Sequence, residues 1–280
     1  MTESVLTVVT LNVFGPANPD WARRSALVAD TLQAVGPDLV ALQEVPVDDD
    51  LAVVHRLLGP GYTCHPFSRP AEDGVAGVLA TRAPSRLVRE VDQRCTPRAH
   101  AFPWCATLLA EAGTALGRVL AVHHKPSWQF GYEVERERQA LAVAEHVEAV
   151  AADYDHVVVL GDFDATPDSA SLQFLSGRRS MAGTSVCYQD AWETRHPYDA
   201  GLTFEARNPL VRAGEVSTAV SRRIDYVLVR AGLHGPTLEV RFCERLLDEP
   251  VDGVWASDHF GVVAELALPD TPPGRMGPVS

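Results

Sequence analysis

Short apolar runs rich in valine recur along almost the whole chain, and they limit the folds that it can adopt. In His156–Gly161, with the sequence HVVVLG, apolar residues follow one another without the alternation of a half-exposed strand. Such runs are typical of strands that are covered on both faces. The strands that the sequence predicts are Val5–Val13, Asp38–Val45, Gly74–Thr81, Ala106–Ala110, Arg118–His123, His156–Gly161, Ile224–Arg230, Thr237–Cys243 and His259–Leu268.

Helical patterns separate several of these strands. In Tyr132–Ala152, the apolar residues Ala140, Val143 and Val147 recur at the spacing of one helix face. The other predicted helices are Asp20–Val35, Asp49–Leu58 and Ser169–Leu175. Helices and hairpin-like strand pairs in this order predict two packed sheets flanked by helices. No linker divides the chain, so we expect one domain over residues 1–268 and a disordered, Pro- and Gly-rich tail over residues 269–280.

Composition narrows the class of protein. No apolar run reaches the roughly 18 residues of a membrane-spanning helix, so we expect no stable membrane insertion. The N-terminal segment has no basic stretch before its first apolar run, which predicts a cytoplasmic protein. Five cysteines without CxxC spacing argue against a disulfide framework and a zinc ribbon. No feature of the sequence indicates an obligate protein partner.

Polar side chains stand where two of the predicted strands end. Asn12 ends the first strand, and Glu44 ends the second within LQEV. A carboxylate at the end of a buried run is costly unless a cation or hydrogen-bond donors compensate it. For this segment alone, an acidic residue at an exposed strand end remains the alternative.

The segment GDFDATP follows the strand His156–Gly161 directly. Asp162 and Asp164 point to the same side of an extended chain. Two such carboxylates repel each other unless a cation, a shared proton or a transferred phosphoryl group lies between them. Mg²⁺ prefers hard oxygen ligands of this kind, and Mn²⁺ can bind to similar ones. The alternative is an acidic turn that caps a helix.

Two further carboxylates and a histidine lie near the C-terminus. Asp225 falls inside a predicted strand, while Asp258 and His259 stand at the head of the last one. Neighbouring residues of a strand point to opposite faces, so we expect different roles for this pair. Asp258 is interpreted as a metal-binding or water-orienting carboxylate and His259 as an acid/base or phosphate donor. Asp225 would then hold the imidazole in its useful tautomer. For this segment alone, an unrelated Ser-Asp-His sequence at the surface remains the alternative.

The segment HHKPSWQF, which follows the predicted strand Arg118–His123, supplies more candidates. His124 comes directly after that strand, and Lys125 is the only lysine in the chain. A compact ammonium here indicates a phosphate contact, although a solvated surface lysine is equally consistent with the sequence. Trp128 and Phe130 either stack on a base or apolar substrate group, or pack the loop.

In their order along the chain, these segments resemble the endonuclease/exonuclease/phosphatase superfamily, which has the deoxyribonuclease I-like fold. The resemblance runs from Thr10 to about Leu268 and rests on TLN, LQEV, the strand-end His124, GDFDATP, RRIDYVLV and SDHFGVVAEL. It implies an α/β (α+β) fold, namely a four-layer α-β-β-α sandwich of two mixed β-sheets flanked by helices. It also implies a metal-dependent hydrolase with its site at the top of the paired sheets.

The resemblance assigns a role to most of these residues. Asp162 would orient and deprotonate the attacking water, and His259, supported by Asp225, would contact the scissile phosphate. His124 would be a phosphate-contacting or leaving-group histidine. The metal-binding residues would be Glu44, Asn12 and Asp258. From the residues themselves we expect substrate contacts at Lys125, Trp128 and Arg223.

Asp164 departs from the family pattern, which usually has Asn at this position. An amide can donate a hydrogen bond to phosphate, whereas an ionised carboxylate repels it. The sequence therefore leaves Asp164 protonated, turned away, or bound to a metal.

We expect a Mg²⁺-dependent phosphoester hydrolase that acts on a small or lipid-like phosphodiester or phosphomonoester. One alternative is a DNA or RNA nuclease with Arg178, Arg179, Arg222 and Arg223 on its rim. The net charge of −13 disfavours that alternative, because nucleic-acid binders draw most of their affinity from basic faces. The other alternative, motivated by Asp164, is a metal-dependent enzyme of specialised metabolism with a non-phosphate substrate.

Overall fold

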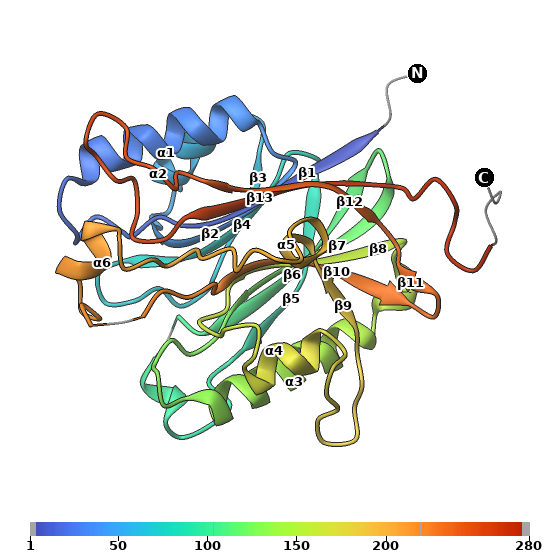
Figure 1. Ribbon diagram of the computed structural model, residues 1–280. Coiled ribbons are helices and arrows are strands. Elements are labelled where there is room, and N and C mark those ends of the chain that lie inside the picture. Colours follow the sequence, from blue (N-terminus) through green and yellow to red (C-terminus); the bar gives the residue numbers. More distant parts are fainter. Residues whose placement is uncertain (1–3, 103, 219, 276–280) are drawn as a thin grey trace.

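The computed structural model describes residues 4–102, 104–218 and 220–275. Its strands form two sheets (Figure 1). The strands of the first sheet, in spatial order, are β12 (Glu239–Leu246), β13 (Gly261–Ala267), β1 (Val5–Asn12), β2 (Leu39–Pro46), β4 (Val75–Thr81) and β3 (Thr63–Pro66). Those of the second are β11 (Gly235–Pro236), β10 (Asp225–Gly232), β8 (His156–Asp162), β7 (Gly117–Lys125), β6 (Ala106–Thr114) and β5 (Ser85–Asp92), with β9 (Tyr188–Asp190) also paired to β10.

Both sheets are mixed, because each contains one parallel pair among antiparallel ones. The parallel pairs are β1 with β2 and β7 with β8. Helices α1 (Trp21–Val35) and α2 (Ala52–Leu58) cover the first sheet, whereas α3 (Glu133–Glu148) and α4 (Ala170–Leu175) cover the second (Figure 1). Two short helices, α5 (Ala191–Arg195) and α6 (Pro209–Ala213), lie in the connections. This four-layer α-β-β-α arrangement confirms the predicted fold class.

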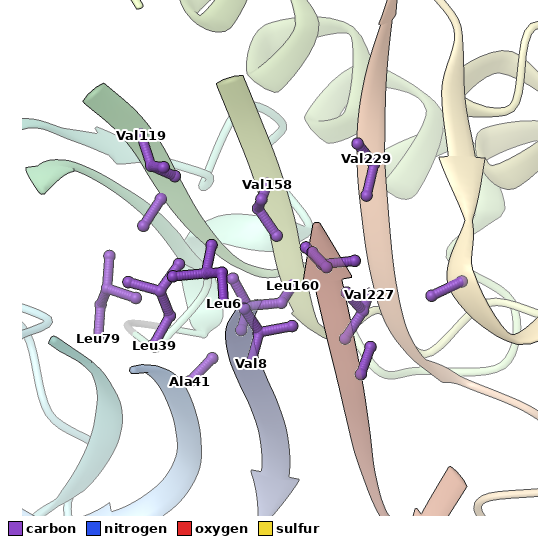
Figure 2. Packing of buried hydrophobic residues seen from close by; sticks show 14 of the residues in the cluster. Leu6, Val8, Leu39, Ala41, Leu79, Val119, Val158, Leu160, Val227 and Val229 are labelled. Atoms are coloured by element: carbon purple, nitrogen blue, oxygen red, sulfur yellow. The ribbon is translucent and has the colours of Figure 1, made fainter. Parts of the chain in front are cut away.

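The apolar runs of the sequence are explained by the layers on either side of each sheet. Leu6 and Val8 of β1 meet Val158 and Leu160 of β8 between the two sheets (Figure 2). Val9, the neighbour of Val8, points the other way and packs beneath α1 and α2. Both faces of the central strands are thus buried, and each fully buried Val or Leu side chain contributes about 1.5–3 kcal/mol.

Several elements differ from those that the sequence predicts. Strands β3, β5, β9 and β11 were not expected, since β5 is a charged edge strand and the other three are very short. Strand β13 begins at Gly261, so Asp258 and His259 precede it rather than forming its head. The expected opposition of their side chains therefore fails, because the alternation of faces holds only within a regular strand.

The expected tail lies partly within the described residues. Residues 269–275 form no helix or strand, and Asp270 pairs with Arg241 at 3.0 Å. Residues 276–280, also assigned to the tail, lie outside the described residues. No helix in the described part of the chain is both long enough and apolar enough to cross a bilayer.

Candidate active site

Strand ends from both sheets meet at one place in the sandwich. Asn12, Lys125 and Asp162 are the last residues of β1, β7 and β8. Asp225 begins β10 and stands directly opposite Asp162 in the antiparallel register. Because residues in register share a face of the sheet, these two carboxylates point to the same side. Four segments far apart in the sequence thereby bring polar groups together.

A cavity of about 830 Å³ opens above these strand ends. Its lining contains Glu44, Asp162, Asp164, Asp258 and His259, together with Lys125 and Trp128 from the same set of predicted site residues. Asn12 and Asp225 are almost wholly buried and lie beneath this lining, where they contact its residues. His124 and Arg223 are not part of it.

Asn12 joins two of the carboxylates. Its Nδ2 donates to Glu44 Oε1 at 2.9 Å and to Asp162 Oδ2 at 3.1 Å. Its Oδ1 accepts a hydrogen bond from the backbone N–H of Phe14 at 3.0 Å. In this arrangement the oxygen predicted as a metal ligand already has a partner, and the amide acts as a bridge between Glu44 and Asp162.

Three residues with a strained backbone lie in the cavity lining. Phe14, Glu44 and Asp164 all line the cavity and all adopt positive φ angles, of 53°, 54° and 52°. This conformation costs roughly 1–2 kcal/mol for a residue with a side chain. At Glu44 it coincides with a break in the β2–β4 register, which turns the carboxylate out of the strand. Strain of this kind persists where the surrounding structure fixes it, and it is enriched at functional sites.

His259 and Asp225 form a buried pair at the floor of the cavity. The imidazole Nδ1 lies 3.0 Å from Asp225 Oδ2, and Nε2 lies 4.0 Å from Asp162 Oδ2. Burial alone would lower the pKa of His259, but the carboxylates of Asp225 and Asp162 outweigh it and raise that pKa. Ser257 Oγ accepts from the backbone N–H of His259 and donates to the carbonyl of Asn12, which fixes the ring relative to β1. The Nε2–H of a protonated His259 is thus available to an anionic group.

Lys125 is buried and bound by both acids of GDFDATP. Its Nζ donates to Asp162 Oδ2 at 2.7 Å and to the carboxylate of Asp164. Burial alone would lower the pKa of Lys125, but these two carboxylates raise it well above its ordinary value. The solvated surface lysine considered from the sequence is therefore wrong. Asp164 is not turned away, because it shares the ammonium with Asp162. Burial and the Asp162 carboxylate nevertheless raise the pKa of Asp164 to about 6.

The structure corrects the prediction for His124. Along β7, Val119 and Ala121 face the other sheet, and Leu120 and Val122 face the helices. By the same alternation Lys125 faces inward and His124 faces the helix layer, where its ring meets Phe163 edge-on. Its Nδ1 lies 2.7 Å from Thr107 Oγ1. His124 is thus placed on the opposite side of the sheet from the cavity.

We expect His124→Asn to keep kcat/KM within about threefold, whereas the same change at His259 removes more than about a hundredfold. Burial holds the pKa of His124 at about 3, so the folded state keeps the ring neutral while the unfolded chain protonates it near pH 6.5. His124 therefore destabilises the fold as the pH falls below 6.5. Chemical denaturation at pH 7.5 and pH 5 measures this effect. Between these pH values the free energy of unfolding should fall less in His124→Asn than in the wild-type protein, by at most about 1.4 kcal/mol per pH unit. An inactive but stably folded His124→Asn would contradict this placement.

The structure also corrects the prediction for Arg223. Its guanidinium is buried, forms an ion pair with Asp190, and donates from Nε to the carbonyl of Ala200 at 3.1 Å. It lines a separate hollow of about 270 Å³ rather than the main cavity. The neighbouring Arg222, which the sequence indicated only for the nuclease alternative, lines both. Nothing local distinguishes the two arginines, because the decisive partner, Asp190, lies far away in the sequence.

The sequence reasoning also missed aromatic and polar residues around the site. Trp104 and Phe204 line the cavity, and the Phe204 ring packs on His259 with a centroid distance of 5.1 Å. Thr203 Oγ1 accepts from the backbone N–H of Asp225. These residues come from loops without a chemical motif, so no signal in the sequence links them to the site.

Among the described residues, Asp162, Asp225 and His259 form a group that could hold a metal, with one possible ligand atom each within 4.8 Å of the others. In that group, however, the contact with Asp225 already engages the Nδ1 of His259. Glu44, Asp162 and Asp258 are further carboxylates that line the cavity.

The electrostatics of Asp258 fit a cation. Burial and the nearby carboxylates of Glu44 and Asp162 raise the pKa of Asp258, although His259 acts in the opposite sense. Carboxylates that crowd together in this way are stabilised by a divalent ion. The residues present therefore suit a hard, oxygen-preferring metal.

Several solved structures have the same fold. D. rerio TDP2, complexed with a single-strand DNA product, has a TM-score of 0.72 and 19% identity, and the match covers 94% of this chain and 99% of that one. The human Nocturnin catalytic domain with bound sulfate has a TM-score of 0.66 and 18% identity, over 95% of each chain. An endonuclease/exonuclease/phosphatase from Bacteroides vulgatus has a TM-score of 0.66 and 18% identity, and the match covers 95% of this chain and 100% of that one. At these identities the likeness shows the fold.

Sequence comparison identifies the family. No curated protein sequence matches the chain. The sequence model of the Endonuclease/Exonuclease/phosphatase family, by contrast, matches residues 9–259, which include every residue of the site described above. Members of this family are metal-dependent hydrolases, as the resemblance of the sequence motifs implied. The chain belongs to the Endonuclease/Exonuclease/phosphatase family.

Proposed function

We propose that the protein is a Mg²⁺-dependent hydrolase of small or lipid-like phosphoesters. The observation that carries this proposal is the meeting of Glu44, Asp162, Asp258 and the Asp225–His259 pair at one cavity. This set combines oxygen ligands for a cation, a carboxylate for the attacking water and a donor for the phosphate. Phosphoester hydrolysis needs these three functions within reach of one phosphorus atom.

Glu44 and Asp258 would hold the metal, with Asn12 orienting Glu44 from beneath. The all-oxygen ligand set favours Mg²⁺, and Mn²⁺ can replace it. When bound, the ion would polarise the phosphoryl oxygens and offset the negative charge of the cavity.

Asp162 would orient the attacking water. Burial alone would raise its pKa, but Lys125 and His259, with the hydrogen bonds from Lys125 and Asn12, lower it, so the carboxylate stays ionised at neutral pH. An ionised carboxylate accepts a hydrogen bond from a water molecule and thereby directs the lone pair of the water oxygen at the phosphorus. His259 Nε2–H would donate to an oxygen of the same phosphate, and Asp225 keeps the ring oriented.

The lining of the cavity supports a small or partly apolar substrate. Trp104, Trp128 and Phe130 contribute aromatic surface on which a ring or chain can pack. The acidic residues of the lining extend beyond the catalytic ones to Asp73 and Glu215. Such a rim repels a polyanion with many phosphates, whereas one or two phosphates can be compensated locally.

A nuclease is the second candidate, favoured by the fold shared with D. rerio TDP2 in complex with a DNA product. Activity on a non-phosphate metabolite is a weaker third candidate. It was motivated by Asp164, and the pairing of Asp164 with Lys125 offers another explanation for that carboxylate.

A substrate panel tests the proposed function, with bis(p-nitrophenyl) phosphate, a phosphomonoester, sphingomyelin, plasmid DNA and RNA. We expect cleavage of a small ester in Mg²⁺ or Mn²⁺, and its loss by at least about a hundredfold in excess chelator. Adding Mg²⁺ back should restore the rate and exclude unfolding as the cause. Faster turnover of DNA or RNA, with a steep salt dependence, would favour the nuclease. Turnover that persists in chelator would contradict the metal site.

The five cysteines are all free in the structure, which is consistent with the reducing environment of the cytoplasm, where we place the protein. We further propose that residues 1–268 act as a single catalytic domain without an obligate protein partner.

A further inference from the structure

Arg222 stands on the cavity wall with its charge uncompensated. No carboxylate among the described residues forms an ion pair with it, and its side chain makes no hydrogen bond to any of them; the buried Nε is one of the polar atoms left without a partner. The other cations of the same lining are committed, since Lys125 binds Asp162 and Asp164, and His259 binds Asp225. An arginine that serves only the fold normally has its donors satisfied, because an unsatisfied buried donor costs about 1–3 kcal/mol.

Two other arginines of this chain show that contrast. Arg24 donates to the carbonyls of Val13, Phe14 and Ala256, among others, and Arg223 pairs with Asp190. Both are buried and have several partners each, which is what a structural role requires. Among the described residues, the interaction partners of the Arg222 guanidinium are the aromatic rings of Phe130 and Phe204.

Those aromatic partners hold the guanidinium in place. Its Cζ lies 4.6 Å from the ring centroid of Phe130 and 5.3 Å from that of Phe204. Aromatic faces on a guanidinium attract the cation and leave its edges free to bind an anion. The side chain is therefore oriented before any ligand arrives, which reduces the entropy lost on binding.

Phe204 also sets the position of Arg222 relative to the catalytic centre. Its backbone pairs with Arg222 on one side and with His259 on the other. Its ring touches both the Arg222 guanidinium and the His259 imidazole. The cavity lining therefore runs from His259 past Phe204 to Arg222, where the cavity borders the smaller hollow.

We propose that Arg222 binds a second anionic group of the substrate, a non-reacting phosphate or carboxylate close to the scissile phosphoester. This inference rests on the proposed function and narrows it to substrates with two anionic groups. A single, fixed guanidinium in an acidic lining recognises one such group and gives no track for a long polyanion. Arg222 would be a specificity residue, with the charge-assisted hydrogen bonds of its terminal nitrogens supplying the preference.

The test compares two esters that differ by one phosphate. They are the p-nitrophenyl ester of thymidine 5′-phosphate and the same compound with a further phosphate on the 3′-oxygen. We expect the wild-type protein in Mg²⁺ to prefer the second compound by about tenfold or more in kcat/KM, and rising salt to reduce that preference. Arg222→Gln should abolish most of the preference, and Arg222→Lys should keep part of it, since the charge remains but the planar fork is lost.

Arg86→Gln is the matched control, because Arg86 is an exposed residue of the edge strand β5 that pairs with Glu111 of β6 and is not part of the cavity lining. It should leave the preference unchanged. Equal turnover of both esters by the wild-type protein, or a preference that survives in folded Arg222→Gln, would overturn the inference while leaving the proposed function intact. Absence of metal-dependent turnover of both esters and of the whole panel would instead overturn the proposed function. The Arg222→Lys variant and the salt series decide the question if Arg222→Gln does not fold.

Discussion

Asp162→Asn is expected to lower kcat by roughly a thousandfold or more while leaving the fold intact. Asn has the shape of Asp but no negative charge, so it can neither accept the proton of the attacking water nor hold Lys125 and His259 by charge. Its amide also meets the Nδ2 of Asn12, which now donates to Asp162 Oδ2 at 3.1 Å. Steady-state rates on the small ester with the best turnover, together with thermal unfolding, measure both quantities.

The control for this change is Asp155→Asn. Asp155 is exposed and precedes β8, at the end of the strand opposite to Asp162, so the same substitution there removes a charge without touching the cavity. Its kcat should stay near that of the wild-type protein. If Asp162→Asn retained a tenth of the wild-type kcat, the assignment of Asp162 to the attacking water would be wrong.

Lys125→Met is expected to have the second-largest effect. It removes the ammonium that compensates Asp162 and Asp164 and leaves two buried carboxylates side by side. Breaking a buried ion pair by removing one partner costs about 3–5 kcal/mol, so the variant should unfold at much lower denaturant concentration. The rate should fall by about a hundredfold, because Asp162 loses the contact that fixes its geometry.

Substitution of Asp164 tests the ion pair of Lys125 with Asp164 from the other side. Asp164→Asn leaves Lys125 bound to Asp162 and introduces the amide donor that the family usually has, so we expect kcat/KM within about threefold of wild type or above it. The double variant Lys125→Met/Asp164→Asn should be more stable than Lys125→Met, because one of the two uncompensated carboxylates is gone. The two changes should deviate from additivity by about 0.5–3 kcal/mol. A collapse of the native reaction in Asp164→Asn would show that this carboxylate has a chemical role of its own.

Much of the fold followed from local pattern. Apolar runs such as those around Val8, Val158 and Val227 are typical of strands buried on both faces, and the hairpin-like strand pairs between the helices favoured two stacked sheets with helices outside them. The short edge strand β3 and the charged strand β5 escaped this reasoning. Edge strands bury little, so their sequences carry no comparable signal.

The candidate site also has a part that local pattern predicted and a part that it did not. Glu44, Asp162 and Asp225 stand out in the sequence because each interrupts or ends an apolar strand, where a carboxylate is costly without a partner. The segment containing Asp258 and His259 stands out through the motif it resembles. Their gathering at one cavity follows from the ends of β1, β7 and β8 and the start of β10 lying together, which the chain order alone does not state.

Three properties of the protein were decided only by the tertiary structure. The face of β7 that meets the other sheet excludes His124 and brings in Lys125, because a shift of one residue reverses every side chain of a strand. The partner of Arg223 is Asp190, which leaves Arg222 free to face the cavity. Asp164 forms an ion pair with Lys125, which ends another strand. Sequence pattern determines which side chains are costly to bury, whereas their partners depend on long-range packing that no local pattern records.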